Sequence, residues 1–252
     1  FFALVGVAVA RLPESQRVQM AGFFAALGNV MLTIVGWVLW LAPAGVFALA
    51  VGVAARAGGG AFLALGHYIL IVAGLGFVVL LAAYPVAVLL GRKSPGAFAR
   101  AVLPAQAVAF STQSSLASLP AMLASCRQLG IRETSADFVL PLAVAIFRAT
   151  SPAMNLAVAI YVAKLTDVPL TPATIAAGAA VALVTTIGSV SLPGTISFVA
   201  SVGPIALAMG VPIGPLALLV AVEMLPDIMR TVGNVTMDVA VTASVDHAQP
   251  KD

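Results

Sequence analysis

Charged residues are scarce in this chain. Asp, Glu, Lys and Arg make up 8% of its 252 residues, whereas soluble domains contain about 25%. Apolar residues make up 62%, more than a soluble fold can bury. No acidic or basic residue occurs between Arg17 and Arg56, or between Arg56 and Arg92. Because a membrane-spanning helix needs about 20 apolar residues, each stretch can cross a bilayer. The composition excludes a soluble protein and predicts a polytopic membrane protein.

Cysteine and histidine are nearly absent as well. Cys126 is the only cysteine, and His67 and His247 are the only histidines. These counts exclude a disulfide framework, a cysteine metal site and a His-rich metal site. We therefore expect no metal and no cofactor apart from a coupling cation. Basic residues do not cluster with aromatic ones, so nucleic acid is not an expected partner. Because the chain begins at Phe1 without a charged leader, we expect no signal peptide and a fragment that lacks earlier spans.

The positions of the basic residues predict the orientation in the membrane. Lys and Arg accumulate in cytoplasmic loops. They group in three connecting regions and the tail, which we place inside: Arg11 and Arg17; Arg92, Lys93 and Arg100; Arg127 and Arg132; and Lys251. The loops with Arg56 and Lys164 are placed outside. The prediction is a multi-pass protein of the cell inner membrane.

Two full spans and two shorter hairpins are expected along the chain. The spans cover residues 23–55 and 62–90, with an outer loop at Gly58-Gly59-Gly60. Residues 95–129 are too few for two crossings yet basic at both ends, which predicts a re-entrant helical hairpin with a Ser-rich tip. Non-helical backbone at bilayer depth is tolerated only when buried in protein or lining a wet cavity. The tip is therefore a candidate binding site. Residues 171–210 predict a second hairpin.

The two halves of the chain are related. A span at residues 133–165 follows the first hairpin and should break near Pro152, because proline removes a helix donor. A final polar helix at 213–243 follows the second hairpin. Ser118-Leu119-Pro120 recurs as Ser191-Leu192-Pro193, and the two hairpins enter from opposite sides. The predicted fold is therefore an all-α integral membrane protein with two re-entrant hairpins in an inverted repeat, which points to a midplane site.

The final helix carries six polar residues on one stripe. At about 100° per residue, they fall within an arc of about 100°: Glu223, Asp227, Arg230, Thr231, Asn234 and Asp238. A charged side chain at mid-bilayer costs about 2.5 to 3.5 kcal/mol. The stripe must therefore face protein, water or ligand, and we interpret it as a binding site. The alternative is a self-paired network, in which Asp227 pairs with Arg230 and Asp238 with another cation.

Other candidates have two interpretations each. The Ser-rich tip with Ser114 and Ser115 is either a set of helix caps or, with helix N-termini pointing inward, a carboxylate site. Arg148 is either an ion-pair partner of Asp238 or Glu223, or a ligand to the substrate.

These motifs resemble the dicarboxylate/amino acid:cation symporter family, which includes prokaryotic glutamate and aspartate transporters. The resemblance rests on Ser114-Ser115-Leu116-Ala117-Ser118-Leu119-Pro120, on the segment from Asp227 to Asp238, and on the match that begins at Trp37. It implies that Asp227 binds a substrate amino group, Arg230 a side-chain carboxylate, and Thr231 and Asn234 the remaining polar groups. Asp238, with Asn234, would bind a cation.

The resemblance also implies that two parts of the chain have different roles. Residues 1–60 would be scaffold-type helices and residues 61–252 the transport domain. Ser114 and Ser115 would close the site from one side, and the backbone of residues 191–194 from the other. The family forms homotrimers whose transport domains carry the site across the bilayer, as an elevator does. The expected function is a non-enzymatic symporter for dicarboxylates or acidic amino acids, with a small carboxylate solute and the lipid bilayer as partners.

One departure from the family pattern concerns sodium. Where the family has Asn-Met-Asp-Gly-Thr, this chain has Phe147-Arg148-Ala149-Thr150-Ser151, and Gln113 replaces the arginine that precedes the first-hairpin serines. Arg148 brings a permanent positive charge. We hypothesise that it does electrostatically what bound sodium does in relatives, so that sodium coupling is weak or absent. The coupling cation, sodium or proton, stays open.

Three other functions compete with a symporter. A homologue that binds or exchanges its solute without sodium coupling is the first, and a channel formed by the two hairpins is the second. An intramembrane enzyme is the third. It is disfavoured because a serine nucleophile needs an adjacent base, and neither histidine is placed to be one.

Overall fold

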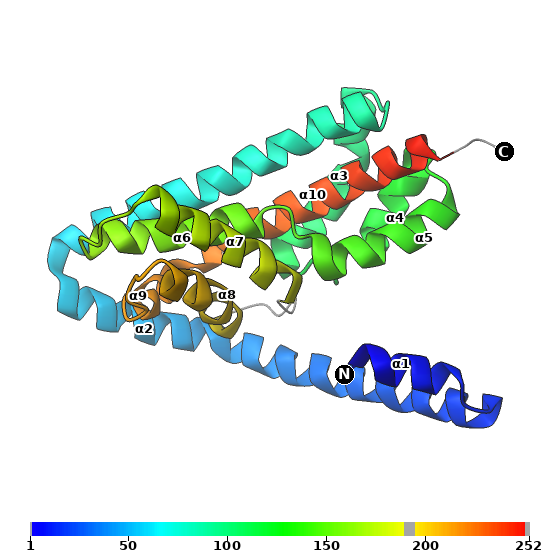
Figure 1. The fold of residues 1–252 in the computed structure, drawn as a ribbon, viewed down its shortest axis with the longest axis horizontal. Helices are drawn as coiled ribbons and strands as arrows, with labels where there is room; N and C mark the ends of the chain where they lie inside the picture. The colour runs from blue at the N-terminus through cyan, green and yellow to red at the C-terminus, as the bar shows by residue number, and fades with distance from the viewer. Residues whose placement is uncertain (1, 189–194, 250–252) are drawn as a thin grey trace. The chain divides into compact units, whose positions relative to one another are not determined.

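The computed structural model describes residues 2–188 and 195–249. Every regular element in these ranges is a helix, which confirms the predicted all-α class (Figure 1). The elements are α1 (Phe2–Ala10), α2 (Glu14–Pro85), η1 (Val86–Leu90), α3 (Pro95–Thr112), α4 (Leu119–Gln128), α5 (Glu133–Leu142), η2 (Ala143–Phe147), α6 (Ser151–Leu165), α7 (Pro172–Gly188), α8 (Thr195–Ala208), α9 (Leu216–Leu219), η3 (Val220–Val222) and α10 (Met224–Ala248).

The chain divides into two compact units, Phe1–Val51 and Gly52–Asp252. The first unit holds α1 and the first part of α2, and the second holds everything that follows. The sequence predicts a boundary at residue 60, within the same helix. Assignment of these parts to a scaffold and a transport domain stays a prediction.

The expected outer loop at Gly58-Gly59-Gly60 is wrong at the level of secondary structure. These glycines lie inside α2, which the structure assigns as a helix from Glu14 to Pro85. A glycine costs a helix about 1 kcal/mol relative to alanine. Apolar helix-forming residues flank the run on both sides, and an apolar surrounding favours a backbone that satisfies its own hydrogen bonds. The apolar surroundings therefore outweigh the low helix propensity of the three glycines.

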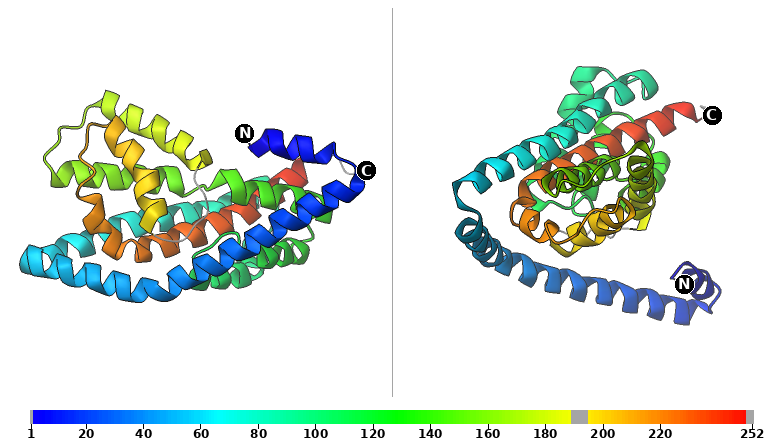
Figure 2. Two further views of the ribbon diagram at one scale, coloured as in Figure 1. Left: turned by 90° about the horizontal axis from the view of Figure 1, so that it is seen from below. Right: turned by 60° about the vertical axis from the view of Figure 1, so that its left-hand side comes forward.

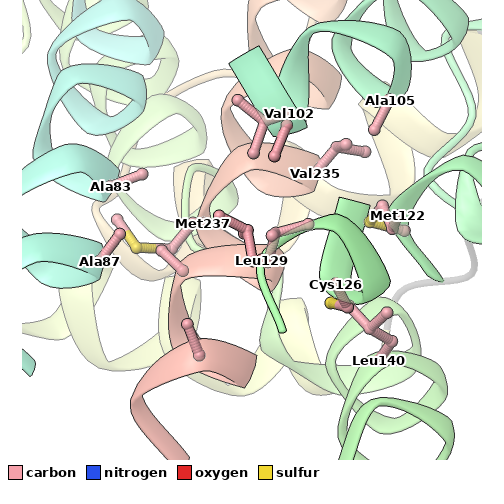
Figure 3. Close-up of a cluster of buried hydrophobic side chains, with 14 of the residues drawn as sticks. Ala83, Ala87, Val102, Ala105, Met122, Cys126, Leu129, Leu140, Val235 and Met237 are labelled. Carbon is pink, nitrogen blue, oxygen red and sulfur yellow. The ribbon is translucent and has the colours of Figure 1, made fainter. Parts of the chain in front are cut away.

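Within the second unit, α10 packs against α3, α4 and α5, and also against η1 and η2 (Figure 1). The final helix is shorter at its start than predicted, since α9 and η3 precede it and α10 begins at Met224. A buried apolar cluster joins these elements, and Figure 3 shows its members Ala83, Ala87, Val102, Ala105, Met122, Cys126, Leu129, Leu140, Val235 and Met237. Small side chains let the helices approach closely.

A second apolar cluster joins the later part of α2 to the helices that follow Arg148, which are α6, α7, α8 and α9. It includes Tyr68, Met154, Ile205 and Leu216. The helices α7 and α8 pack against each other, and both pack against α6 (Figure 2). Two stretches among the described residues are long and apolar enough to cross a membrane: Leu63–Leu90 and Glu133–Leu165. The helices α7 and α8 contain shorter apolar segments, Pro172–Ile187 and Phe198–Ala208.

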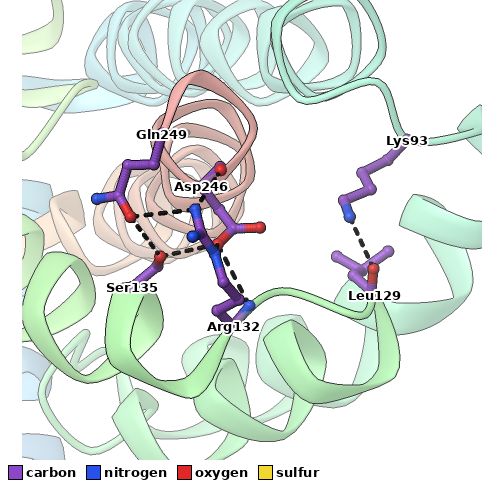
Figure 4. A network of polar contacts seen from close by, with 6 residues as sticks. All are labelled: Lys93, Leu129, Arg132, Ser135, Asp246 and Gln249. Carbon is purple, nitrogen blue, oxygen red and sulfur yellow. Dashed lines mark hydrogen bonds and ion pairs between the residues drawn. The ribbon is translucent and has the colours of Figure 1, made fainter. Parts of the chain in front are cut away.

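A polar network fixes the far end of α10 to the start of α5 (Figure 4). The Nε of Arg132 donates to Asp246 Oδ1 at 2.8 Å, and Ser135 Oγ donates to the same oxygen at 2.7 Å. The Arg132 Nη2 also donates to the Asp246 carbonyl at 2.9 Å. Beside it, Lys93 Nζ donates to the Leu129 carbonyl at 2.8 Å and caps the end of α4.

Asp246 lies beyond the expected span, which ends at residue 243. Burial raises the pKa of its carboxyl group, but hydrogen bonds from Arg132 and Ser135 lower it by more. The net result is a pKa below the ordinary value, so the ionised form of Asp246 stabilises the folded chain.

Candidate functional site

The polar stripe predicted on the last helix lies inside the second unit. Thr231 and Asn234 are each 5% exposed and Asp238 is 1% exposed. Asp227 and Arg230 are half-buried, with side chains 21% and 13% exposed. The helix therefore turns its charged face toward protein, as the cost of placing charge in lipid requires.

Two carboxylates hold Arg230 on this stripe. Its Nη1 donates to Asp227 Oδ1 at 2.8 Å, and its Nη2 donates to Glu223 Oε1 at 2.7 Å. The second oxygen of Glu223 accepts from the hydroxyl of Tyr68 at 2.5 Å. The self-pairing of Asp227 with Arg230, which the sequence leaves open, is thus present. Arg230 Nε is buried and has no hydrogen-bond partner within the described ranges.

Asn234 joins the stripe to the start of α6. Its Oδ1 accepts from both the backbone N–H and the hydroxyl of Thr150, each at 2.9 Å. Close packing accompanies this contact: a Cβ on Gly233 would lie 2.6 Å from Thr150 Cγ2 and 3.3 Å from the Gly76 carbonyl. Glycines at 76 and 233 thus allow α2, α6 and α10 to cross at this point.

The backbone between η2 and α6 is non-helical at Arg148. This residue has φ 30° and ψ 63°, in the left-handed region, which is uncommon for a residue other than glycine. Arg148 interacts electrostatically with three charged residues of α10. Arg230 repels it, and Asp227 and Asp238 attract it. Asp238 is buried, and its Oδ1 lacks a hydrogen-bond partner in the part of the chain that the structure describes. The structure thus brings the positive charge of Arg148 into the surroundings of Asp238.

The Ser-rich tip lies between α3 and α4. Gln113 ends α3 in the left-handed region, with φ 51°. Ser114 Oγ accepts from the Ala117 N–H at 3.2 Å, and Ser118 Oγ donates to the Ser114 carbonyl at 2.9 Å. In residues 2–188 and 195–249, no hydrogen bond joins Ser114 or Ser115 to the polar stripe. The tip of the second hairpin, residues 189–194, lies outside the described residues, so the role of Ser191 stays a prediction.

Sequence reasoning missed two residues that touch the stripe, Tyr68 and Thr150. Each has a signal in the sequence. Tyr68 is one of three tyrosines and lies in an uncharged stretch, where a buried hydroxyl needs a partner. Thr150 lies in the segment predicted to break, where the first N–H groups of the next helix also need partners.

An apolar, all-helical chain whose last helix buries a charged stripe defines a class of protein: an integral membrane protein with a polar site among its spans. The chain belongs to the sodium:dicarboxylate symporter family, which it matches over residues 1–248. This confirms the resemblance drawn from the Ser-rich and Asp227–Asp238 motifs.

Relatives in the family are named amino acid transporters. The chain is 30% identical over 244 residues to neutral amino acid transporter B(0) of Homo sapiens, covering 94% of this chain and 44% of the relative. It is 28% identical over 263 residues to neutral amino acid transporter A of Bos taurus, covering 99% and 48%. It is 27% identical over 259 residues to an excitatory amino acid transporter of Caenorhabditis elegans, covering 100% and 50%. The chain spans about half the length of these curated relatives.

Proposed function

We propose that this chain is part of a secondary active transporter that carries amino acids. The observation that supports the proposal is the ion pair between Arg230 and Asp227, on the buried face of α10. A solute with one ammonium and one carboxylate group can replace this pair by two new pairs. Its ammonium binds Asp227 and its carboxylate binds Arg230. The net charge of the site does not change, and each charged group of the solute gains a partner of opposite charge. These new pairs partly offset the desolvation cost of binding.

A plain dicarboxylate such as succinate is a poorer match to the same pair. Its carboxylates could displace Asp227 from Arg230, but they would leave the Asp227 carboxylate without a cation. An unpaired charge in a buried site is strongly unfavourable. The names of the relatives, all amino acid transporters, support the same choice. Thr231 and Asn234, with Ser114 and Ser115, complete the proposed site.

The proposed movement is an elevator. The contacts within Gly52–Asp252 define one compact unit, and we propose that this unit moves as a body and carries the site across the bilayer. A homotrimer in the cell inner membrane is part of the same proposal. It rests on the family membership and on the distribution of Lys and Arg.

The proposed coupling is not to sodium. Arg148 supplies a fixed positive charge near Asp238, the residue expected to bind a cation. The Oδ1 of Asn234, the second expected cation ligand, already accepts two hydrogen bonds from Thr150. Both observations support a site whose charge is balanced by arginine instead of a bound metal ion. They also favour the alternative function, a homologue that exchanges its solute without sodium coupling.

A thermal-shift panel on the purified protein tests the substrate class and the coupling together. Neutral amino acids, acidic amino acids and succinate are each added with sodium and with choline as the counter-ion. Stabilisation by amino acids, weaker stabilisation by succinate and no sodium dependence are expected. Stabilisation by succinate alone would contradict the amino acid proposal. Stabilisation that requires sodium would contradict the role given to Arg148.

A further inference from the structure

We propose that the turn before α3, together with the exposed face of α3, binds an anionic phospholipid whose headgroup contacts Arg92 and Arg100. The site lies at the end of the second unit where Figure 4 shows Lys93 and Arg132. The distribution of Lys and Arg predicts that this end is cytoplasmic. The site shares no residue with the polar stripe of α10.

The basic residues at this end differ in their partners. Arg127 and Arg132 each pair with a carboxylate, at 3.0 Å and 2.8 Å. Arg92 and Arg100 are exposed, and neither forms an ion pair with a carboxylate in the ranges that the structure describes. The charges of these two guanidinium groups are therefore available to a phosphate group from outside the chain.

Local geometry holds both charges near the start of α3. The Nε of Arg100 donates to the Gly96 carbonyl at 3.2 Å, so this side chain runs back toward the N-terminus of its helix. Arg92 precedes α3 in a turn, with φ 52°. The turn is closed by a hydrogen bond from the Lys93 N–H to the Ala87 carbonyl at 3.0 Å. The positive end of the helix dipole adds to the potential of the two arginines.

Exposed apolar side chains continue from these arginines along both helices. Leu89 and Leu90, directly before the turn, are 67% and 60% exposed, and Leu103 and Phe110 of α3 are 58% and 61% exposed. On α3, Arg100, Leu103 and Phe110 lie within an arc of about 80°, at about 100° per residue. A surface that is basic at one end and apolar along its length matches the headgroup and the acyl chains of a phospholipid.

The surroundings of this surface favour a lipid over a soluble partner. It continues from the stretch Leu63–Leu90, which is long and apolar enough to cross a membrane, and only 17% of the apolar window in that stretch is buried inside the chain. Basic residues directly beside a span are typical of binding to anionic lipids. Arginine donates two parallel hydrogen bonds to a phosphate group. A zwitterionic headgroup carries its own cation, which weakens this attraction, so the anionic lipid is the better match.

Native mass spectrometry of the full chain in a non-ionic detergent tests this inference. The protein is given equal amounts of phosphatidylglycerol and phosphatidylcholine with the same acyl chains, and the ratio of the two retained lipids is measured. Each basic residue near an anionic surface changes binding by about fivefold. We therefore expect a preference for phosphatidylglycerol of about tenfold or more. The double variant Arg92→Gln with Arg100→Gln should lower it to about twofold or less, and each single variant should have an intermediate effect.

The matched control is Arg11→Gln with Arg17→Gln. It removes the same charge from two exposed arginines of the first unit, and it should leave the preference unchanged. The melting temperature of each variant without added lipid reports its folding. If the double variant at Arg92 and Arg100 does not fold, the two single variants decide. Inorganic phosphate, which has the charge of a headgroup but no acyl chain, should not displace phosphatidylglycerol.

Four results would overturn the proposed lipid site. The first is equal retention of both lipids by the wild type. The second is a preference that persists without Arg92 and Arg100, or that falls as much in the control, which would show only a general attraction of charges. The third is displacement by inorganic phosphate, which would show an anion site without a lipid. The fourth is loss of an oligomer in the double variant, with no lipid preference in the wild type, which would assign this face to a contact between copies.

Discussion

Asn234 accepts two hydrogen bonds from Thr150 through a single oxygen, one from the backbone N–H and one from the hydroxyl, both at 2.9 Å. Thr150 is fully buried and Asn234 is 5% exposed. The contact satisfies a backbone donor just before α6, where the helix has no partner of its own for it. It thereby attaches the break after Arg148 to the last helix.

Removing this contact should destabilise the protein. In Asn234→Ala, the N–H of Thr150 loses its acceptor in a buried place, at a cost of about 1 to 3 kcal/mol, whereas the Thr150 hydroxyl keeps the Arg230 carbonyl as an acceptor at 3.1 Å. A lower melting temperature in detergent is the expected result. Ser244→Ala is the control, because the Ser244 hydroxyl donates only to the Ala240 carbonyl of its own helix. Equal melting temperatures for the two variants would show that the contact between Asn234 and Thr150 contributes no more to stability than a hydrogen bond within one helix.

Close packing between helices should make Gly233 intolerant of a side chain. A Cβ there would lie 2.6 Å from Thr150 Cγ2, so Gly233→Ala forces α6 and α10 apart and should cost about 1 to 3 kcal/mol. The matched change Gly203→Ala, in α8, meets no atom within 4 Å. Thermal unfolding of both variants checks the prediction, which requires a loss at 233 and no loss at 203. A Gly233→Ala variant as stable as the wild type would contradict the close crossing.

The network around Asp246 should make stability depend on pH in acid. The pKa of Asp246 is lower in the folded chain than in the unfolded one, so its ionised form stabilises the fold above the unfolded value of about 3.9. That contribution is lost as the pH falls through the folded pKa. Melting temperatures of the wild type and Asp246→Asn should differ near neutral pH and converge in strong acid. A difference that stays constant across this range would contradict the prediction.

Arg230 should be needed as an arginine and not only as a positive charge. Lysine cannot donate from two nitrogens in a plane, so Arg230→Lys keeps one charge but loses the simultaneous contact with Glu223 and Asp227. We expect solute binding to weaken by about tenfold or more, while membrane insertion is unaffected. Arg230→Ala should abolish uptake. Binding and uptake by both variants at the wild-type level would remove Arg230 from the site.

The fold class and the polar stripe could be predicted because each depends on residues close in sequence. Helical periodicity places Glu223 and Arg230 on one face of a helix, and the structure pairs them. Tyr68, the partner of Glu223 from α2, could not be predicted. Periodicity within one helix does not show which neighbouring helix packs against its polar face. Tyr68 lies 155 residues away from Glu223 in sequence.

The glycine run in α2 shows why consecutive glycines do not predict a loop reliably in an apolar chain. Gly58, Gly59 and Gly60 would favour a loop in water, where a free backbone is solvated. Among apolar neighbours the same backbone keeps its hydrogen bonds inside the helix. For Ser114, the structure shows a turn contact with Ala117, which is the ordinary capping interaction. The role of Ser114 and Ser115 in binding remains a prediction.

Concentrative uptake in proteoliposomes tests the central claim most directly. Vesicles containing the purified protein are given labelled L-serine and an inward proton gradient, with sodium or with choline outside, and Asp227→Asn is the matched control. We predict uptake above the external concentration that is the same in both salts and is lost in Asp227→Asn. Equilibration without concentration would contradict active transport. Uptake that requires sodium, or that persists in Asp227→Asn, would contradict the site built on Arg148, Asp227 and Arg230.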